Sequence, residues 1–128
     1  MISWENQPEV QYSILRNVGF LLEKRPELLD NDVKMFFVKF NDPYYIKIEK
    51  LHILIKLCNQ QNFEPVLNEL REYTNELDTQ FVRKTINAVG SIAIKYEKSV
   101  DKYTHLISKI NSKGYQHSNA FVENFKRY

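Results

Sequence analysis

Apolar residues recur at intervals of three and four along most of the chain, which is the spacing of one face of an α-helix. The clearest stripe lies within residues 7–24 and is made by Val10, Ile14, Val18, Leu21 and Leu22. The same spacing predicts a second helix over residues 32–40, a third over 43–58, a fourth after Asn62, a fifth after Asp78, a sixth after Ser99 and a seventh that begins near Tyr115. No alternation of apolar and polar residues is long enough to predict a strand. The expected fold class is therefore all-α, with about seven helices.

The break between the second and third predicted helices carries strong helix-start signals. Asp42 is a preferred N-cap residue, because its carboxylate can accept hydrogen bonds from the unpaired amides of a first turn. Pro43 then falls at the first helical position, where its missing N–H is not needed. Asp78 is the matching cap of the fifth helix, and Leu77 and Val82 beside it have the spacing of a hydrophobic staple.

The helix starts repeat with a period of about 36 residues, which is the length of a paired-helix repeat. Equal steps back and forward from Asp42 reach Asn6 and Asp78, which are both good N-cap residues, and a further step reaches Gly114. Repeats of this size are typical of α-solenoids of the HEAT or armadillo kind. Residues 1–128 are therefore predicted to form a single α-solenoid segment, an α-α superhelix of such repeats.

The composition is that of a folded protein without a marked charge preference. Hydrophobic residues make up 43% and aromatic residues 13% of the 128 residues, so general disorder is not expected. The formal net charge is +2, which gives no reason to expect a nucleic-acid partner. There is one cysteine, and no apolar run has the ~20 residues that a membrane helix needs. A cytoplasmic, reducing location is expected.

No arrangement of catalytic or metal-binding residues stands out. His52, His105 and His117 do not form a metal-binding pattern with Cys58, and the chain has neither a phosphate-binding loop nor a nucleophile elbow. Cys58 ends an apolar helix and is interpreted as a small core residue. We therefore expect a protein that is not an enzyme and that has no metal site and no cofactor.

Two features, the lysines of the third predicted helix and a glycine in the first, leave more than one interpretation open. Lys47 and Lys50 lie one turn apart on the third predicted helix, and Lys56 points away from them. They form either a solvated helix face, which is the default, or a patch for phosphate or lipid headgroups. Gly19 lies inside the first helix, where it costs ~1 kcal/mol relative to alanine. A close approach of another helix to this position would explain why a glycine with this cost is present.

A series of short segments occurs in order along the chain. These segments are Pro8-Glu9-Val10-Gln11-Tyr12, Leu15-Arg16-Asn17, Lys24-Arg25-Pro26-Glu27, Phe36-Phe37-Val38-Lys39, Asn41-Asp42-Pro43, Glu49-Lys50-Leu51, Val66-Leu67, Glu69-Leu70, Glu72-Tyr73, Phe81-Val82-Arg83-Lys84, Ala88-Val89-Gly90 and Ala93-Ile94-Lys95. Together they closely resemble the trunk of the β chain (β-adaptin) of the heterotetrameric clathrin adaptor complexes. The resemblance runs from Pro8 to about Ile110 and is less clear from Gly114 on.

The resemblance implies a curved α-solenoid without catalytic activity, of which this chain would be an internal fragment. In that family the trunk embraces the medium and small chains and pairs with the second large chain. Clathrin binds a hinge and an ear domain, which lie outside the region that this chain resembles. The implied function is a scaffold segment in vesicle-mediated intracellular protein transport, in coat assembly and cargo sorting. The implied location is cytoplasmic and peripheral on coated vesicles, Golgi, endosome or plasma membranes, with the membrane reached through the complex.

The candidate residues for packing or partner contact flank the central break, and they are Phe36, Phe37, Tyr44, Tyr45, Lys47 and Lys50. The alternative function is that of another α-solenoid scaffold or carrier, such as a nuclear transport receptor or another coat subunit. A transport receptor is expected to show an acidic concave face with repeated tryptophan and asparagine, whereas this chain has one tryptophan and a basic balance.

Overall fold

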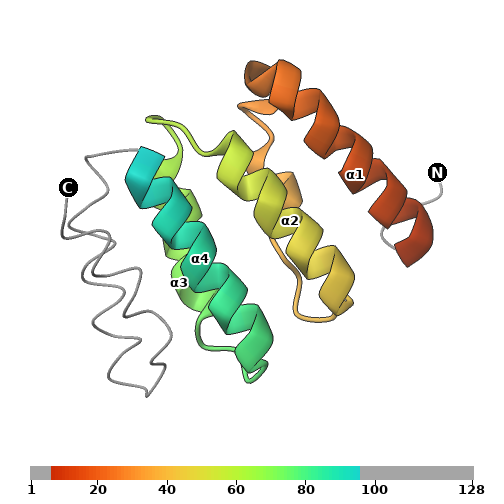
Figure 1. The fold of residues 1–128 in the computed structure, drawn as a ribbon, viewed down its shortest axis with the longest axis vertical. Coiled ribbons are helices and arrows are strands. Elements are labelled where there is room, and N and C mark those ends of the chain that lie inside the picture. Colours follow the sequence, from red (N-terminus) through yellow and green to blue (C-terminus); the bar gives the residue numbers. More distant parts are fainter. Residues whose placement is uncertain (1–6, 96–128) are drawn as a thin grey trace. The chain divides into compact units, whose positions relative to one another are not determined.

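The computed structural model describes residues 7–95 of the 128-residue chain. In this range there are four α-helices, two short 3-10 helices and no strand (Figure 1). The all-α fold class is thus confirmed for the part of the chain that the structure describes. The chain divides into two compact units, Met1–Asn59 and Gln60–Tyr128.

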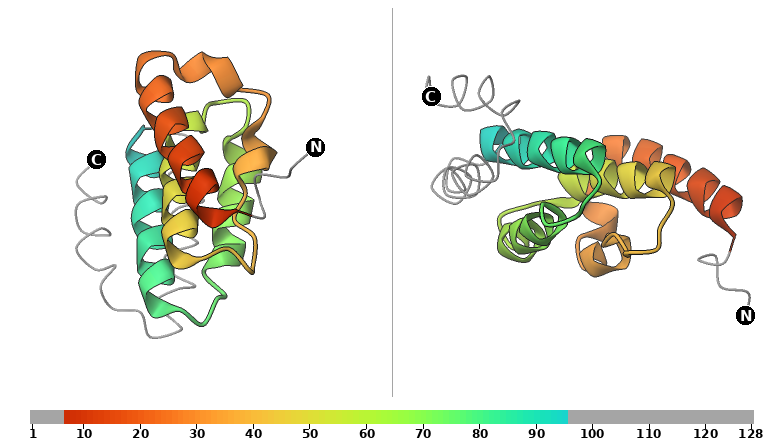
Figure 2. Two further views of the ribbon diagram at one scale, coloured as in Figure 1. Left: turned by 90° about the vertical axis from the view of Figure 1, so that its right-hand side faces the viewer. Right: turned by 90° about the horizontal axis from the view of Figure 1, so that it is seen from below.

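The first unit contains two long helices joined by an irregular return segment. α1 (Pro8–Lys24) and α2 (Tyr44–Leu57) lie side by side and run in the same direction (Figure 1). Between them the chain returns through η2 (Pro26–Leu29) and η3 (Val33–Phe36), and both of these 3-10 helices pack against α2, as the views of Figure 2 also show. The helices predicted over residues 7–24 and 43–58 are confirmed.

The helix predicted over residues 32–40 is wrong. One short 3-10 helix, η3, occupies its first half, and the backbone at Phe37 is extended, with φ −65° and ψ 136°. Phe36 is buried, whereas Phe40, one helical turn later, is 91% exposed, so the two side chains do not share a helix face. Pro43 disfavours helical backbone at the residue before it, and aromatic and β-branched residues have low helix propensity. The stretch buries part of its apolar surface as an irregular segment instead.

The prediction that Asp42 caps the helix after the break is also wrong. The N-cap position of α2 is Pro43, and no side chain makes a capping hydrogen bond there. The Asp42 carboxylate instead accepts hydrogen bonds from the backbone N–H of Lys39, at 2.8 Å, and from the ammonium group of Lys50, at 2.6 Å. Asp42 therefore ties the preceding turn to the middle of α2.

The second unit contains the helical hairpin of α3 (Phe63–Tyr73) and α4 (Thr79–Lys95), which run in opposite directions (Figure 1). Asn62 occupies the N-cap position of α3, but no side chain makes a capping hydrogen bond there. The buried side chains of the two helices include Val66, Leu70, Tyr73, Phe81, Val82, Ile86, Val89 and Ile92. The rings of Tyr73 and Phe81 lie 5.6 Å apart, centroid to centroid, and link the end of α3 to the start of α4.

Asp78 caps α4, as predicted. Its Oδ1 accepts hydrogen bonds from the backbone N–H groups of Gln80, at 3.0 Å, and Phe81, at 3.3 Å. The hydrophobic staple predicted beside this cap is wrong, because Leu77 is 97% exposed while Val82 is fully buried.

The spacing of the helix starts agrees with the predicted period. α1, α2 and α4 begin at residues 8, 44 and 79, which are 36 and 35 residues apart. Asn6, Gly114 and the predicted sixth and seventh helices lie outside the described residues. The number of repeats and the single solenoid segment over residues 1–128 therefore stay predictions. None of the helices described between residues 7 and 95 is long and apolar enough to cross a membrane.

Candidate interaction site

The predicted contact residues divide into buried and exposed groups. Phe36 and Lys50 are buried, Phe37 and Lys47 are half-buried, and Tyr44 and Tyr45 are exposed by 41% and 43%. Phe36 and Lys50 therefore belong to the interior of the first unit. The proposed contact role of the others stays a prediction.

Lys50 and Asp42 form a buried ion pair. Their side chains are 2% and 9% exposed, and Lys50 Nζ lies 2.6 Å from Asp42 Oδ2. Both interpretations of Lys50, as part of a solvated helix face or of a phosphate patch, are wrong. A carboxylate removed from solvent needs more than one hydrogen bond, and the backbone N–H of Lys39 supplies the second.

The second bond to Asp42 closes a tight turn over residues 39–42. The backbone N–H of Asp42 donates to the carbonyl of Lys39 at 3.0 Å, and the backbone N–H of Lys39 donates to the Asp42 carboxylate at 2.8 Å. Phe40 is a central residue of this turn, between the two residues that the hydrogen bonds join, and it is 91% exposed. The turn thus holds an aromatic side chain in solvent.

Tyrosines follow this turn directly in the chain. Tyr44 and Tyr45 form the first turn of α2. The ring of Tyr45 makes an edge-to-face contact with Tyr12 of α1, with centroids 5.6 Å apart and planes at 75°. This end of the first unit therefore presents aromatic side chains from both long helices.

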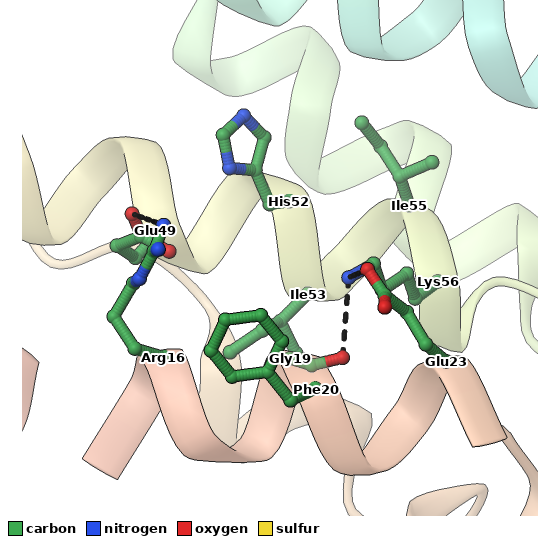
Figure 3. A pocket seen from close by; sticks show the side chains of 9 residues that line it. All are labelled: Arg16, Gly19, Phe20, Glu23, Glu49, His52, Ile53, Ile55 and Lys56. Atoms are coloured by element: carbon green, nitrogen blue, oxygen red, sulfur yellow. Dashed lines mark hydrogen bonds and ion pairs between the residues drawn. The ribbon is translucent and has the colours of Figure 1, made fainter. Parts of the chain in front are cut away.

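A groove of about 310 Å³ lies along the α1–α2 contact (Figure 3). It is lined by Arg16, Gly19, Phe20 and Glu23 of α1 and by Glu49, His52, Ile53, Ile55 and Lys56 of α2. The ring of Phe20 is 55% exposed, and the Arg16 guanidinium lies 5.4 Å from its centroid, in cation–π contact.

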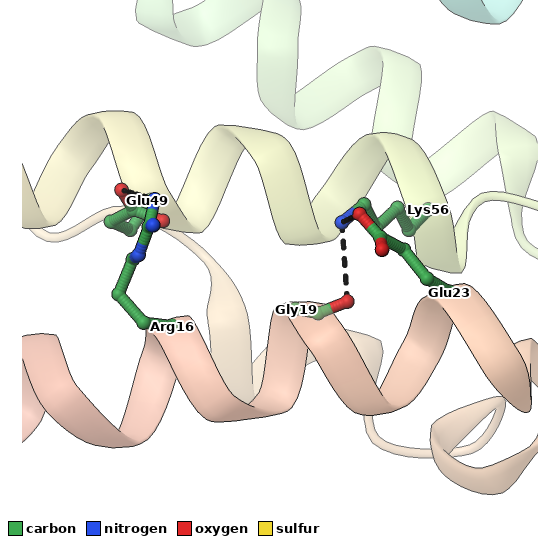
Figure 4. Close-up of polar contacts among 5 residues, drawn as sticks. All are labelled: Arg16, Gly19, Glu23, Glu49 and Lys56. Carbon is green, nitrogen blue, oxygen red and sulfur yellow. Dashed lines mark hydrogen bonds and ion pairs between the residues drawn. The ribbon is translucent and has the colours of Figure 1, made fainter.

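Ion pairs cross the two ends of the groove (Figure 4). Arg16 Nη1 lies 3.6 Å from Glu49 Oε1, and Lys56 Nζ lies 3.0 Å from Glu23 Oε1. Lys56 Nζ also donates to the backbone carbonyl of Gly19 at 3.1 Å. These charges join α1 to α2, so their geometry serves the packing of the helix pair.

A close helix–helix approach does not explain Gly19, because the only atom of the described residues that an added Cβ would meet is the end of the flexible Lys56 side chain. A Cβ added at Gly19 would lie 3.7 Å from Lys56 Nζ, which is an ordinary van der Waals distance. The core position predicted for Cys58 is confirmed, since this residue is buried. His52 is exposed on α2, and His105 and His117 lie outside the described residues.

The charges of the groove were missed by the sequence reasoning, although the sequence contains a signal for them. Glu49 follows Arg16 by 33 residues, and Lys56 follows Glu23 by the same 33 residues. On two parallel helices, opposite charges at one constant offset come to face each other. The signal becomes readable only once α1 and α2 are known to be neighbours.

Comparison with known proteins decides the family. The family model described as the adaptin N terminal region matches residues 2–127, which is nearly the whole chain. This chain belongs to the adaptin N-terminal family. The resemblance to a β-adaptin segment is thereby confirmed.

The similar adaptins are β subunits. The chain is 51% identical over 96 residues to AP-1 complex subunit beta-1 of Mus musculus, a match that covers 75% of this chain and 10% of that protein. It is 47% identical over 96 residues, with the same coverage, to AP-1 complex subunit beta of Dictyostelium discoideum. It is 42% identical over 104 residues to AP-2 complex subunit beta of Schizosaccharomyces pombe, covering 80% of this chain and 15% of that protein. The chain thus spans 10–15% of the length of these relatives.

Proposed function

We propose that this adaptin chain is a non-catalytic scaffold segment of an adaptor-complex β chain and acts in vesicle-mediated intracellular protein transport. The observation that carries the proposal is the 51% identity over 96 residues to AP-1 complex subunit beta-1 of Mus musculus. The proposed roles are coat assembly and cargo sorting. The proposed location is cytoplasmic, on coated vesicles, Golgi, endosome or plasma membranes, with the membrane reached through the complex.

The helix arrangement supports a scaffold. α1 and α2 run in the same direction, and their starts are 36 residues apart, as the first helices of successive α-solenoid repeats would be. The ion pairs of Arg16 with Glu49 and of Lys56 with Glu23 link the two helices across their contact. A rigid helix pair can present an extended surface to partners without any catalytic group.

The proposed partners are the medium chain, the small chain and the second large chain of an adaptor complex, and clathrin would bind outside this segment. Co-expression of this chain with those three subunits of the mouse AP-1 complex, followed by capture through a tag on this chain, tests the proposal. We expect at least one of the three subunits to co-purify in stoichiometric amount.

Two controls sharpen this experiment. Mouse AP-1 complex subunit beta-1, expressed in place of this chain, shows that the other subunits are competent to assemble. Leu54→Asp places a charge at a side chain that is 1% exposed, so this variant should lose the partners together with the fold. The proposal fails if the mouse β subunit assembles and the folded wild-type chain captures none of the three.

A further inference from the structure

We draw no further inference here: the strongest candidate, the exposed apolar stripe that Val10, Ile14 and Leu21 form along α1, carries nothing because nothing in the structure shows what covers it.

Discussion

The carboxylate of Asp42 and the ammonium of Lys50 have little access to solvent, so each depends on the other. Asp42→Ala leaves a buried charge without its partner, and we expect it to lower the free energy of unfolding by about 3–5 kcal/mol. The double variant Asp42→Ala with Lys50→Met should lose much less, because no unpaired charge remains. Urea unfolding followed by circular dichroism measures both values.

The exposed pair of Arg25 and Glu27 provides the control for this ion pair. Its atoms lie 3.4 Å apart, but both side chains are at least 60% exposed. Arg25→Ala should therefore change the stability by less than about 1 kcal/mol. An Asp42→Ala loss no larger than the Arg25→Ala loss would show that the Asp42–Lys50 pair contributes no more than a surface contact.

Gly19 offers a change in the opposite direction. Alanine at this position gains helix propensity, and its Cβ would stand at the ordinary distance of 3.7 Å from Lys56 Nζ. We expect Gly19→Ala to raise the free energy of unfolding by about 0.5–1 kcal/mol. Thermal or urea unfolding measures the gain. A loss of stability would mean that the approach of Lys56 to the Gly19 carbonyl does not tolerate the added methyl group.

Among the described elements, the start of α4 depends on one side chain. Asp78 accepts from the amides of Gln80 and Phe81, which would otherwise be unpaired. Asp78→Ala should therefore cost about 1 kcal/mol, and Asp78→Ser should retain most of the stability. Asp30→Ala, at another exposed aspartate, serves as the control in urea unfolding. Equal stability of the Ala and Ser variants at position 78 would refute the capping role.

The elements show what sequence patterns can and cannot predict here. α1, α2 and α4 are 14–17 residues long, so the helical spacing of their apolar residues can be recognised in the sequence, and these three helices were predicted correctly. The apolar run before Pro43 is only a few residues long, and its spacing suited a helix as well as an irregular buried segment. Asp42 has a residue type and a position that suit an N-cap, but its carboxylate instead accepts a hydrogen bond from Lys50, eight residues later.

The candidate site was less predictable than the fold, because its parts come from different elements. Tyr44 and Tyr45 could be named as candidates from the sequence, since they adjoin the break, whereas the exposure of Phe40 depends on how the turn packs. The groove charges of α1 face those of α2 across about 33 residues of chain, a distance at which no local pattern links them. Local periodicity thus predicts elements, and tertiary packing decides which side chains stay on the surface.

At the scale of the whole molecule, stability is expected to be local to each compact unit. The described part of each unit buries its own helix pair, α1 with α2 and α3 with α4. In repeat proteins, the total stability is approximately the sum of the stability of each repeat and of the interfaces between neighbouring repeats. Leu15→Ala removes a side chain of α1 that is fully buried, and it should cost about 2–5 kcal/mol.

Hydrogen exchange read by mass spectrometry can locate that loss. Leu15→Ala should speed amide exchange most in α1 and α2, while Ile86→Ala, at an equally buried position of α4, should speed it most in α3 and α4. The two variants are matched controls for each other, because each removes part of one buried aliphatic side chain. If either variant instead raised exchange equally from residue 8 to residue 95, the described chain would unfold as one cooperative body, and the local account of its stability would be wrong.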